Sequence, residues 1–341
     1  MTPILPIGGF LDLEIQPCEK EKKNILNFWG VNKHNAFMFH NARSALHYLL
    51  DYLHLQKLWL PSYICKEMAV MTQDHVLLEY YPIQDNLSPN LEFLADNISP
   101  NDAVLAVDYF GCLPEKKFLT FVQQRSDIIW IEDRAQALYP AIEPWGNWVL
   151  YSPRKLLGVP DGGILVNPHH TVHQPTYEEV SSTAFMLPTL SRFEDIQSHY
   201  NQEWYADYVK NEKQMGISLQ KMSRFSLTLL SNLDPSSIIE SRKNNYNILY
   251  DALKEISFLQ IPAIDFVPLG FPIQVKNRDE IAVKLYQEKI YPAKHWQHLP
   301  SDPLKFQNAH KLSRKILTLP CDQRYGPKEM DRIITTLRSI V

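Results

Sequence analysis

The chain has 341 residues, of which 45% are hydrophobic and 21% are charged, and its formal net charge is -4. This composition is typical of a globular protein and excludes a disordered chain, and the weak negative charge argues against nucleic acid as a partner. The length exceeds what one hydrophobic core usually supports, so we expect two domains.

The cysteines and the apolar segments indicate the cellular compartment of the protein. Four cysteines stand far apart without the spacing of metal ligands, which predicts reduced thiols rather than a disulfide framework. No stretch reaches the roughly 18 apolar residues of a membrane span, and Met1–Gly9 lacks the basic and apolar segments of a secretion signal. We therefore expect a cytoplasmic protein with no membrane partner.

Short apolar runs alternate with helical patterns between residues 40 and 170, which predicts an α/β fold with a mainly parallel sheet. The expected strands are Leu58–Leu60, Val76–Tyr81, Ala103–Val107, Ile128–Ile131, Trp148–Tyr151 and Ile164–Val166. The expected helices are Ala42–Leu55, Cys65–Thr72 and Lys116–Gln124.

The pattern changes after residue 170, first to an irregular stretch rich in Tyr, Ser and Thr and then to a long helix over Ser236–Leu253. Two extended runs and two helices follow, which predicts a small α+β domain at the C-terminus. These elements are Gly270–Val275, Asp279–Glu288, Ile316–Leu319 and Pro327–Ile340. We place the large domain at residues 1–240 and the small one at 241–341.

The most informative segment lies between two expected strands and contains Ser152, Arg154 and Lys155, followed by Gly162 and Gly163. A lysine held at a strand end in a dry pocket has an amine that can form an imine with an aldehyde. Ser152 and Arg154 are suited to bind a phosphate group, and the two glycines allow close backbone approach. A loop lysine by itself is more often a surface residue, so this interpretation depends on its neighbours.

Two carboxylates, Glu132 and Asp133, follow a buried strand at the end where open α/β sheets bind ligands. A carboxylate beside a pyridine nitrogen keeps that nitrogen protonated and the ring electron-withdrawing, and Asp133 is our candidate for this role. Gln136, one turn later, is expected to face the same pocket. The simpler alternative is that both acids only cap the next helix.

The segment containing Ala42, Arg43 and Ser44 runs from an extended piece into a helix, so its amides and the helix dipole favour a phosphate group in front of them. Read alone, this segment is an ordinary helix start.

Taken in order, five motifs resemble the DegT/StrS sugar-aminotransferase family, and the resemblance covers about residues 35–170 well. The motifs are Asn41–Leu46, Leu60–Tyr63, Val107–Gly111, Glu132–Gln136 and Ser152–Lys155 with Pro160–Gly163. The resemblance implies the pyridoxal-phosphate-dependent transferase fold type I and a homodimer with shared active sites. It also implies transamination from an amino donor such as glutamate to a keto-sugar or related keto compound, in polysaccharide or natural-product sugar biosynthesis.

The resemblance also assigns roles to residues. Lys155 holds pyridoxal 5'-phosphate as a Schiff base and then carries the proton, Asp133 binds the pyridine nitrogen, and Gln136 lies near the ring. Ser152 binds the phosphate together with the Arg43–Ser44 turn. The family serine lies five residues before the lysine, but Leu150 stands there, and Cys65 replaces the aromatic that stacks on the ring. Stacking is therefore expected from Tyr63, Tyr109 or another aromatic, and the chain is expected to be a divergent branch.

Other candidates remain open. The partner-subunit phosphate motif is echoed only at Ser223 and Arg224, and Arg324 and Tyr325 are either substrate-binding or surface residues. We expect no metal site, because the histidine-rich loops lack ligands at metal spacing. Two other functions stay in view: another pyridoxal-phosphate reaction such as elimination or C–S cleavage, and a non-catalytic regulatory protein that keeps the fold.

Overall fold

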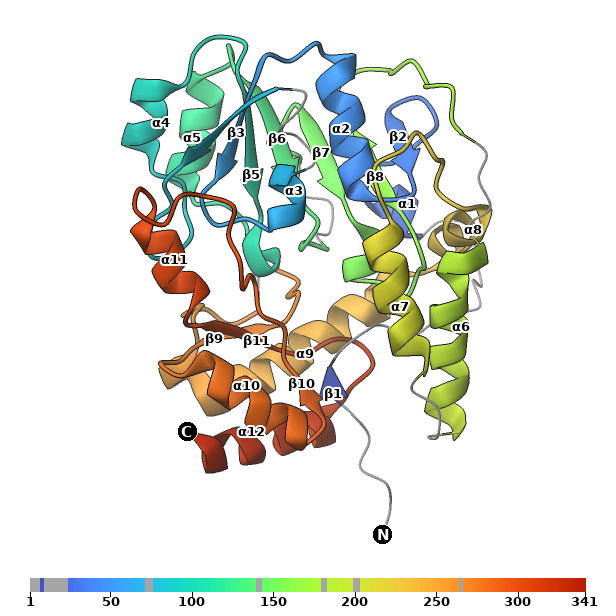
Figure 1. Ribbon diagram of the computed structural model, residues 1–341, viewed down its shortest axis with the longest axis vertical. Coiled ribbons are helices and arrows are strands. Elements are labelled where there is room, and N and C mark those ends of the chain that lie inside the picture. Colours follow the sequence, from blue (N-terminus) through green and yellow to red (C-terminus); the bar gives the residue numbers. More distant parts are fainter. Residues whose placement is uncertain are drawn as a thin grey trace.

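The computed structural model describes residues 7–8, 24–70, 76–138, 143–178, 183–198, 203–263 and 266–341. Its centre is a seven-stranded sheet in the order β2-β8-β7-β6-β5-β3-β4 (Figure 1). The strands are β2 (Ala36–Phe39), β3 (Lys57–Pro61), β4 (Leu77–Tyr81), β5 (Ala103–Val107), β6 (Ile129–Asp133), β7 (Trp148–Tyr151) and β8 (Gly163–Val166). Only β8 runs antiparallel to its neighbours. The predicted mainly parallel α/β sheet is confirmed.

Helices cover both faces of this sheet, which explains why its strands are apolar runs rather than alternating ones. On one face, α2 (Ala42–Tyr52) and α3 (Lys66–Val70) pack over Leu58 and Leu60. On the other face, Trp59 packs with α4 (Leu91–Asn97) and α5 (Lys116–Gln124), and α1 (Ile25–Phe28) and α8 (Arg224–Asn232) cover β7 and β8.

The C-terminal part has its own core and two small sheets. In one sheet β9 (Phe271–Gln274) pairs antiparallel with β11 (Ile316–Leu319), and in the other β1 (Ile7–Gly8) pairs parallel with β10 (Ile290–Tyr291). The helices are α9 (Pro235–Leu253), α10 (Arg278–Gln287), α11 (Gln307–Ser313) and α12 (Pro327–Ile340). The predicted α+β character is confirmed. The division at residues 240 and 241 stays a prediction, and the pairing of β1 joins residues 7–8 to the C-terminal part.

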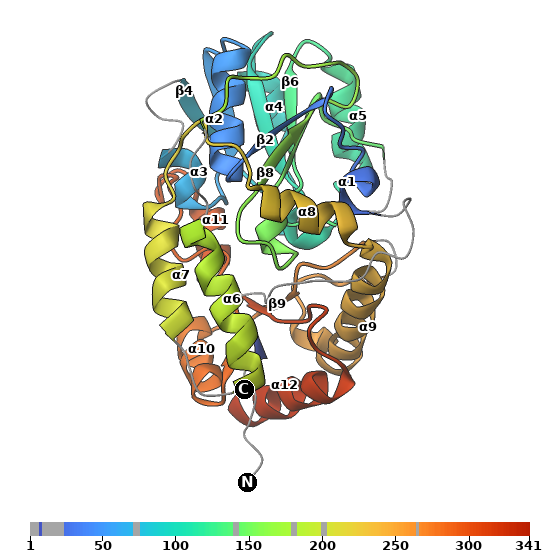
Figure 2. The same cartoon turned by 90° about the vertical axis from the view of Figure 1, so that its right-hand side faces the viewer.

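The sequence interpretation was wrong between residues 183 and 214. The expected irregular stretch contains two helices, α6 (Thr183–Ser198) and α7 (Glu203–Gln214), which pack against each other and extend from the sheet toward the C-terminal part (Figures 1 and 2). Pro188 lies inside α6, where a proline removes a backbone hydrogen bond and normally indicates a break. The helix α7 is rich in charged residues, which hide its apolar face. Neither helix therefore carries a clear sequence signal.

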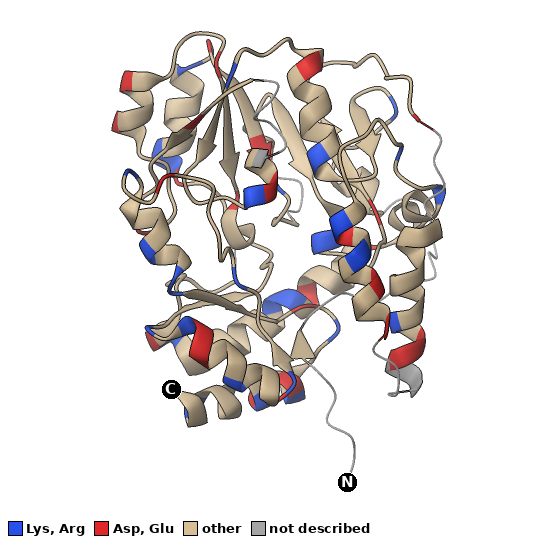
Figure 3. Ribbon diagram, viewed as in Figure 1, with Lys and Arg blue, Asp and Glu red and all other residues tan. Residues whose placement is uncertain are grey.

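Charge is mixed over the whole molecule, with acidic and basic residues interspersed on most helices of both parts (Figure 3). Among the residues placed by the structure, no helix combines the length and the apolar character that crossing a bilayer requires. The three described cysteines of the chain, Cys65, Cys112 and Cys321, are free thiols, and Cys18 lies outside the described residues.

The close approach of β8 to the start of α2 gives a direct test of the fold. A Cβ atom added at Gly163 would lie 2.0 Å from the carbonyl carbon of Asn41 and 2.2 Å from the amide nitrogen of Ala42. Because backbone cannot yield as a side chain can, Gly163→Ala is expected to lower the free energy of unfolding by about 3 kcal/mol. Urea unfolding of both proteins measures this loss.

Gly216→Ala is the matched control, because a Cβ atom there meets no atom within 4 Å. It is expected to change the free energy of unfolding by no more than about 0.5 kcal/mol. Equal stability of the Gly163→Ala protein and the wild type would contradict this packing.

Candidate active site

A cavity of about 790 Å³ opens where β6 and β7 end, between the large sheet and the C-terminal part. The sheet side contributes Ala42, Arg43, Cys65, Asp133, Ser152, Arg154 and Lys155. The other walls come from α7, with Tyr208, Glu212 and Lys213, and from C-terminal residues that include Arg242, His295, Trp296 and Asp322. The cavity therefore lies at the carboxyl ends of parallel strands, where such sheets bind ligands.

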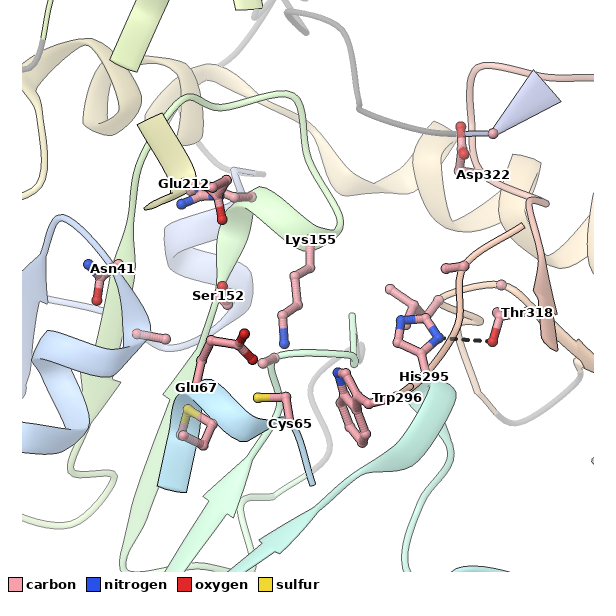
Figure 4. Close-up of a pocket in the computed structure, with 18 of the residues that line it drawn as sticks. Asn41, Cys65, Glu67, Ser152, Lys155, Glu212, His295, Trp296, Thr318 and Asp322 are labelled. Atoms are coloured by element: carbon pink, nitrogen blue, oxygen red, sulfur yellow. Dashed lines mark hydrogen bonds and ion pairs between the residues drawn. The ribbon is translucent and has the colours of Figure 1, made fainter. Parts of the chain in front are cut away.

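Lys155 lies in the short turn that follows β7, and its amide donates to the carbonyl of Ser152 at 3.1 Å. Its side chain is exposed to the cavity, and its amine points toward Glu67 and Cys65 (Figure 4). The next carbonyl, that of Leu156, accepts hydrogen bonds from Arg242 at 2.9 Å and Gln323 at 3.1 Å. The turn is thus fixed from the C-terminal side while the amine stays accessible.

Asp133 ends β6, and the register of β6 with β7 places it opposite Leu150. Its Oδ1 accepts a hydrogen bond from the Ala135 amide at 2.9 Å. Burial raises the pKa of the Asp133 carboxyl, and the positive charge of Lys155 partly opposes that rise. Asp133 and Lys155, predicted to act together, therefore line one cavity and interact electrostatically.

The start of α2 forms another part of the wall. Asn41 caps the helix by accepting a hydrogen bond from the Ser44 amide at 2.8 Å, and Ala42 and Arg43 line the cavity. Ser44 itself is buried behind them, where its hydroxyl accepts a hydrogen bond from Ser218 at 3.2 Å. The predicted phosphate segment thus reaches the cavity through Ala42 and Arg43.

Arg154 lines the same end of the cavity but is already engaged by α7. Its Nη2 forms an ion pair with Glu212, and its Nη1 donates to the sulfur of Met215 at 2.8 Å. Burial opposes the charge of Arg154, but Glu212, Tyr208 and Asp161 together raise the pKa of the guanidinium. Arg43 also reaches Met215, donating to its carbonyl at 2.7 Å.

Three predicted ring-contacting residues, Tyr63, Tyr109 and Gln136, lie behind the cavity wall and not among its lining residues. Tyr63 donates to the His295 carbonyl and Tyr109 donates to the Tyr63 carbonyl. Gln136 accepts a hydrogen bond from the Phe110 amide at 2.8 Å. These side chains support the wall from within the core.

One aromatic side chain that does face the cavity is Trp296, whose ring centroid lies 5.5 Å from that of Tyr63 (Figure 4). Next to it, the Nδ1 atom of His295 lies 2.9 Å from the hydroxyl of Thr318. Burial lowers the pKa of His295 to about 3, and Lys155 acts in the same direction, so this histidine is neutral. The described residues contain no group of three or more side chains arranged to hold a metal ion.

The candidate substrate residues lie outside the cavity lining. Arg224 is exposed at the start of α8, and Ser223 is buried and donates to Asp161 at 2.6 Å. Arg324 pairs with Asp322 at 2.8 Å and lies over the ring of Tyr325, whose hydroxyl accepts a hydrogen bond from the Gly8 amide. Of this C-terminal group only Asp322 reaches the cavity.

Sequence reasoning missed several lining residues that come from distant segments. Glu67 directly follows the Cys65–Lys66 dipeptide, and Arg242 lies in the predicted long helix, but neither carries a local motif. Glu212 belongs to a helix that was not predicted. His295 and Trp296 belong to a histidine-rich loop that lacks metal-ligand spacing, and their neighbourhood with Lys155 arises from tertiary packing alone.

Neither a protein-family model nor a curated protein matches this sequence. Solved structures do match. A DegT DnrJ EryC1 StrS aminotransferase from Brucella abortus is 16% identical over 93% of this chain and 88% of its own, with a TM-score of 0.66. The putative sugar aminotransferase Spr1654 from Streptococcus pneumoniae, in its PLP form, is 13% identical over 98% of both chains, with a TM-score of 0.68. DesV from S. venezuelae is 16% identical over 89% of this chain and 84% of its own, with a TM-score of 0.65.

These likenesses establish that the chain has the fold of the DegT/StrS-type aminotransferases. The predicted fold type I is confirmed. The low identities agree with the expectation of a divergent sequence.

The buried carboxylate gives a prediction about stability. Because burial raises the pKa of Asp133, its ionised form costs the folded chain free energy above the folded pKa, and this cost vanishes below its usual pKa of about 4. Asp133→Asn keeps an acceptor for the Ala135 amide and removes the charge. It is expected to raise the melting temperature of the cofactor-free protein at pH 8, with a gain that shrinks as the pH falls toward 4.

Asp127→Asn serves as the control of opposite sign. A hydrogen bond from Arg125 lowers the pKa of Asp127, so removing that charge is expected to lower the melting temperature slightly at pH 8. An Asp133→Asn protein that melts below the wild type at pH 8 would contradict the assignment of a costly buried charge.

Proposed function

We propose that this protein is a pyridoxal-phosphate-dependent aminotransferase. The observation that carries the proposal is the pair formed by Lys155 and Asp133, which come from neighbouring strand ends and line one cavity together with Arg43 and Arg154. An amine, a buried carboxylate and two guanidinium groups are the partners that an aldehyde, a pyridine nitrogen and a phosphate require. The likeness to solved aminotransferases supports the same function.

The residues present fit the cofactor. The cavity volume lies in the range of about 300–1,000 Å³ that is usual for small-molecule sites, and it suffices for a ligand of this size with its substrate. Lys155 would hold the aldehyde, Asp133 the ring nitrogen, and Ser152, Ala42, Arg43 and Arg154 the phosphate. Trp296 is the aromatic that lies in the cavity beside Cys65 (Figure 4).

Bound in this way, the protonated pyridine ring supplies an electron sink for the bond that is broken at the substrate carbon. Asp133 supports this by holding a negative charge in a buried place, where its interaction with a ring N–H is strong. Lys155 carries the proton between carbon atoms, because its amine is exposed to the cavity while its turn is fixed by Arg242 and Gln323.

We further propose glutamate as the amino donor and a keto-sugar, such as a nucleotide-linked one, or a related keto compound as the acceptor, in polysaccharide or natural-product sugar biosynthesis. The sequence resemblance supports this substrate class, as do the solved structures, because Spr1654 is described as a putative sugar aminotransferase. From the resemblance we also propose a homodimer with shared active sites, and the widely spaced cysteines favour a cytoplasmic location.

The test is the absorption spectrum of the purified protein with added pyridoxal phosphate, followed by glutamate, in parallel with Lys155→Ala. We expect a visible absorption band in the wild type that glutamate shifts, and no such band in the variant. Transamination by the variant is expected to fall by at least about 100-fold, because a positioned proton carrier contributes that much.

The outcomes separate the alternatives. A band that glutamate leaves unchanged, but that another amino acid shifts with release of its side-chain group, indicates elimination or C–S cleavage. Absence of any band in the wild type would overturn the enzyme proposal and favour a non-catalytic protein with this fold.

A further inference from the structure

The anion-binding end of the cavity contains an unexpected acidic residue, Glu212 of α7. Its carboxylate is paired with the Arg154 guanidinium, which the proposed function assigns to the cofactor phosphate. The two side chains differ in exposure, with 14% of Arg154 and 35% of Glu212 accessible to solvent. The arginine is therefore fixed in the wall, and the glutamate is its more accessible partner.

Positive charge exceeds negative charge around this pair. Arg43 and Arg154 both contact Met215, so their guanidinium groups converge on one residue, and Lys213 lines the same cavity. Arg154 pairs with the carboxylate of Glu212 and also contacts the neutral Met215 sulfur, while Arg43 donates to a neutral carbonyl. The start of α2, at Ala42, adds a partial positive charge from the same side.

Separating the ion pair costs more free energy for Arg154 than for Glu212. A guanidinium as buried as that of Arg154 is costly without an anion, whereas a carboxylate that is one-third exposed regains water after a rotation of its side chain. A phosphate monoester offers more charge than a carboxylate and accepts two parallel hydrogen bonds from an arginine. Exchange of one anion for the other is therefore favourable in this cavity.

We propose that Glu212 is a built-in competitor for Arg154, which a phosphate monoester must displace to bind. The inference rests on the proposed function, in which that phosphate belongs to the cofactor. It makes Glu212 a specificity-determining residue, because its carboxylate weakens the binding of pyridoxal phosphate and leaves pyridoxal, which has no phosphate, unaffected. In the free protein the same carboxylate keeps Arg154 paired and ties α7 to the turn that carries Lys155.

The first experiment is an equilibrium titration of wild type, Glu212→Gln and Asp207→Asn with pyridoxal phosphate and with pyridoxal, followed by visible absorbance. We expect Glu212→Gln to bind pyridoxal phosphate about tenfold more tightly and to bind pyridoxal as the wild type does. Asp207 is exposed on the same helix and lies outside the cavity lining, so its variant controls for the loss of one negative charge. It is expected to match the wild type with both aldehydes.

A second measurement needs no aldehyde and keeps the inference testable if Lys155 does not react. Inorganic phosphate is expected to raise the melting temperature of Glu212→Gln at a concentration about tenfold lower than for the wild type. Both proteins carry Lys155→Ala in this measurement, so that neither retains cofactor bound covalently during expression.

The results distinguish the two proposals. A wild type that binds neither aldehyde contradicts the proposed function. In that case the phosphate titration alone tests whether Glu212 competes for Arg154. The competitor role would be overturned if Glu212→Gln bound phosphate with the same affinity as the wild type, and pyridoxal phosphate likewise. Weaker binding by Glu212→Gln would also overturn it, because Glu212 would then hold Arg154 in place for the ligand.

Discussion

The arrangement of the cavity depends on one backbone contact, the approach of β8 to the start of α2. Gly162 donates to the His40 carbonyl at 2.7 Å, and Gly163 leaves no space for a Cβ atom against Asn41. This contact joins the reversed strand β8 to β2 and sets the α2 terminus beside the turn that carries Lys155. The parallel pairing of β6 with β7 then brings Asp133 to the same place.

The charges gathered by this contact are arranged for a ligand more than for the stability of the free chain. Asp133 is a buried carboxylate whose pKa is raised by burial, and its nearest compensating charge is the amine of Lys155. Arg154 is held by Glu212, which belongs to α7. A cofactor with a basic ring nitrogen and a phosphate would complement both charges, which is the physical basis of the proposed function.

The sequence predicted the part of the site that is encoded in strand ends. Asp133 and Lys155 each follow a short apolar run, and their strands are neighbours, so the pattern was sufficient to bring them together. The sequence did not predict α6 and α7, because Pro188 and the many charged side chains hide their apolar faces. It also did not predict Trp296 or Glu212 in the cavity, since both arrive through contacts between distant segments. The roles given to Tyr63, Tyr109 and Gln136 stay predictions, and the structure places these side chains behind the wall.

The most direct test of the account is to locate the pyridoxyl group after borohydride reduction of the protein loaded with pyridoxal phosphate, by peptide mass spectrometry. Two of the described lysines line the cavity, Lys155 and Lys213, so the measurement is a choice between them. The account predicts that the group is attached to Lys155 at near-stoichiometric yield. Attachment to Lys213, or spread over surface lysines, would contradict the proposal that the turn after β7 carries the cofactor.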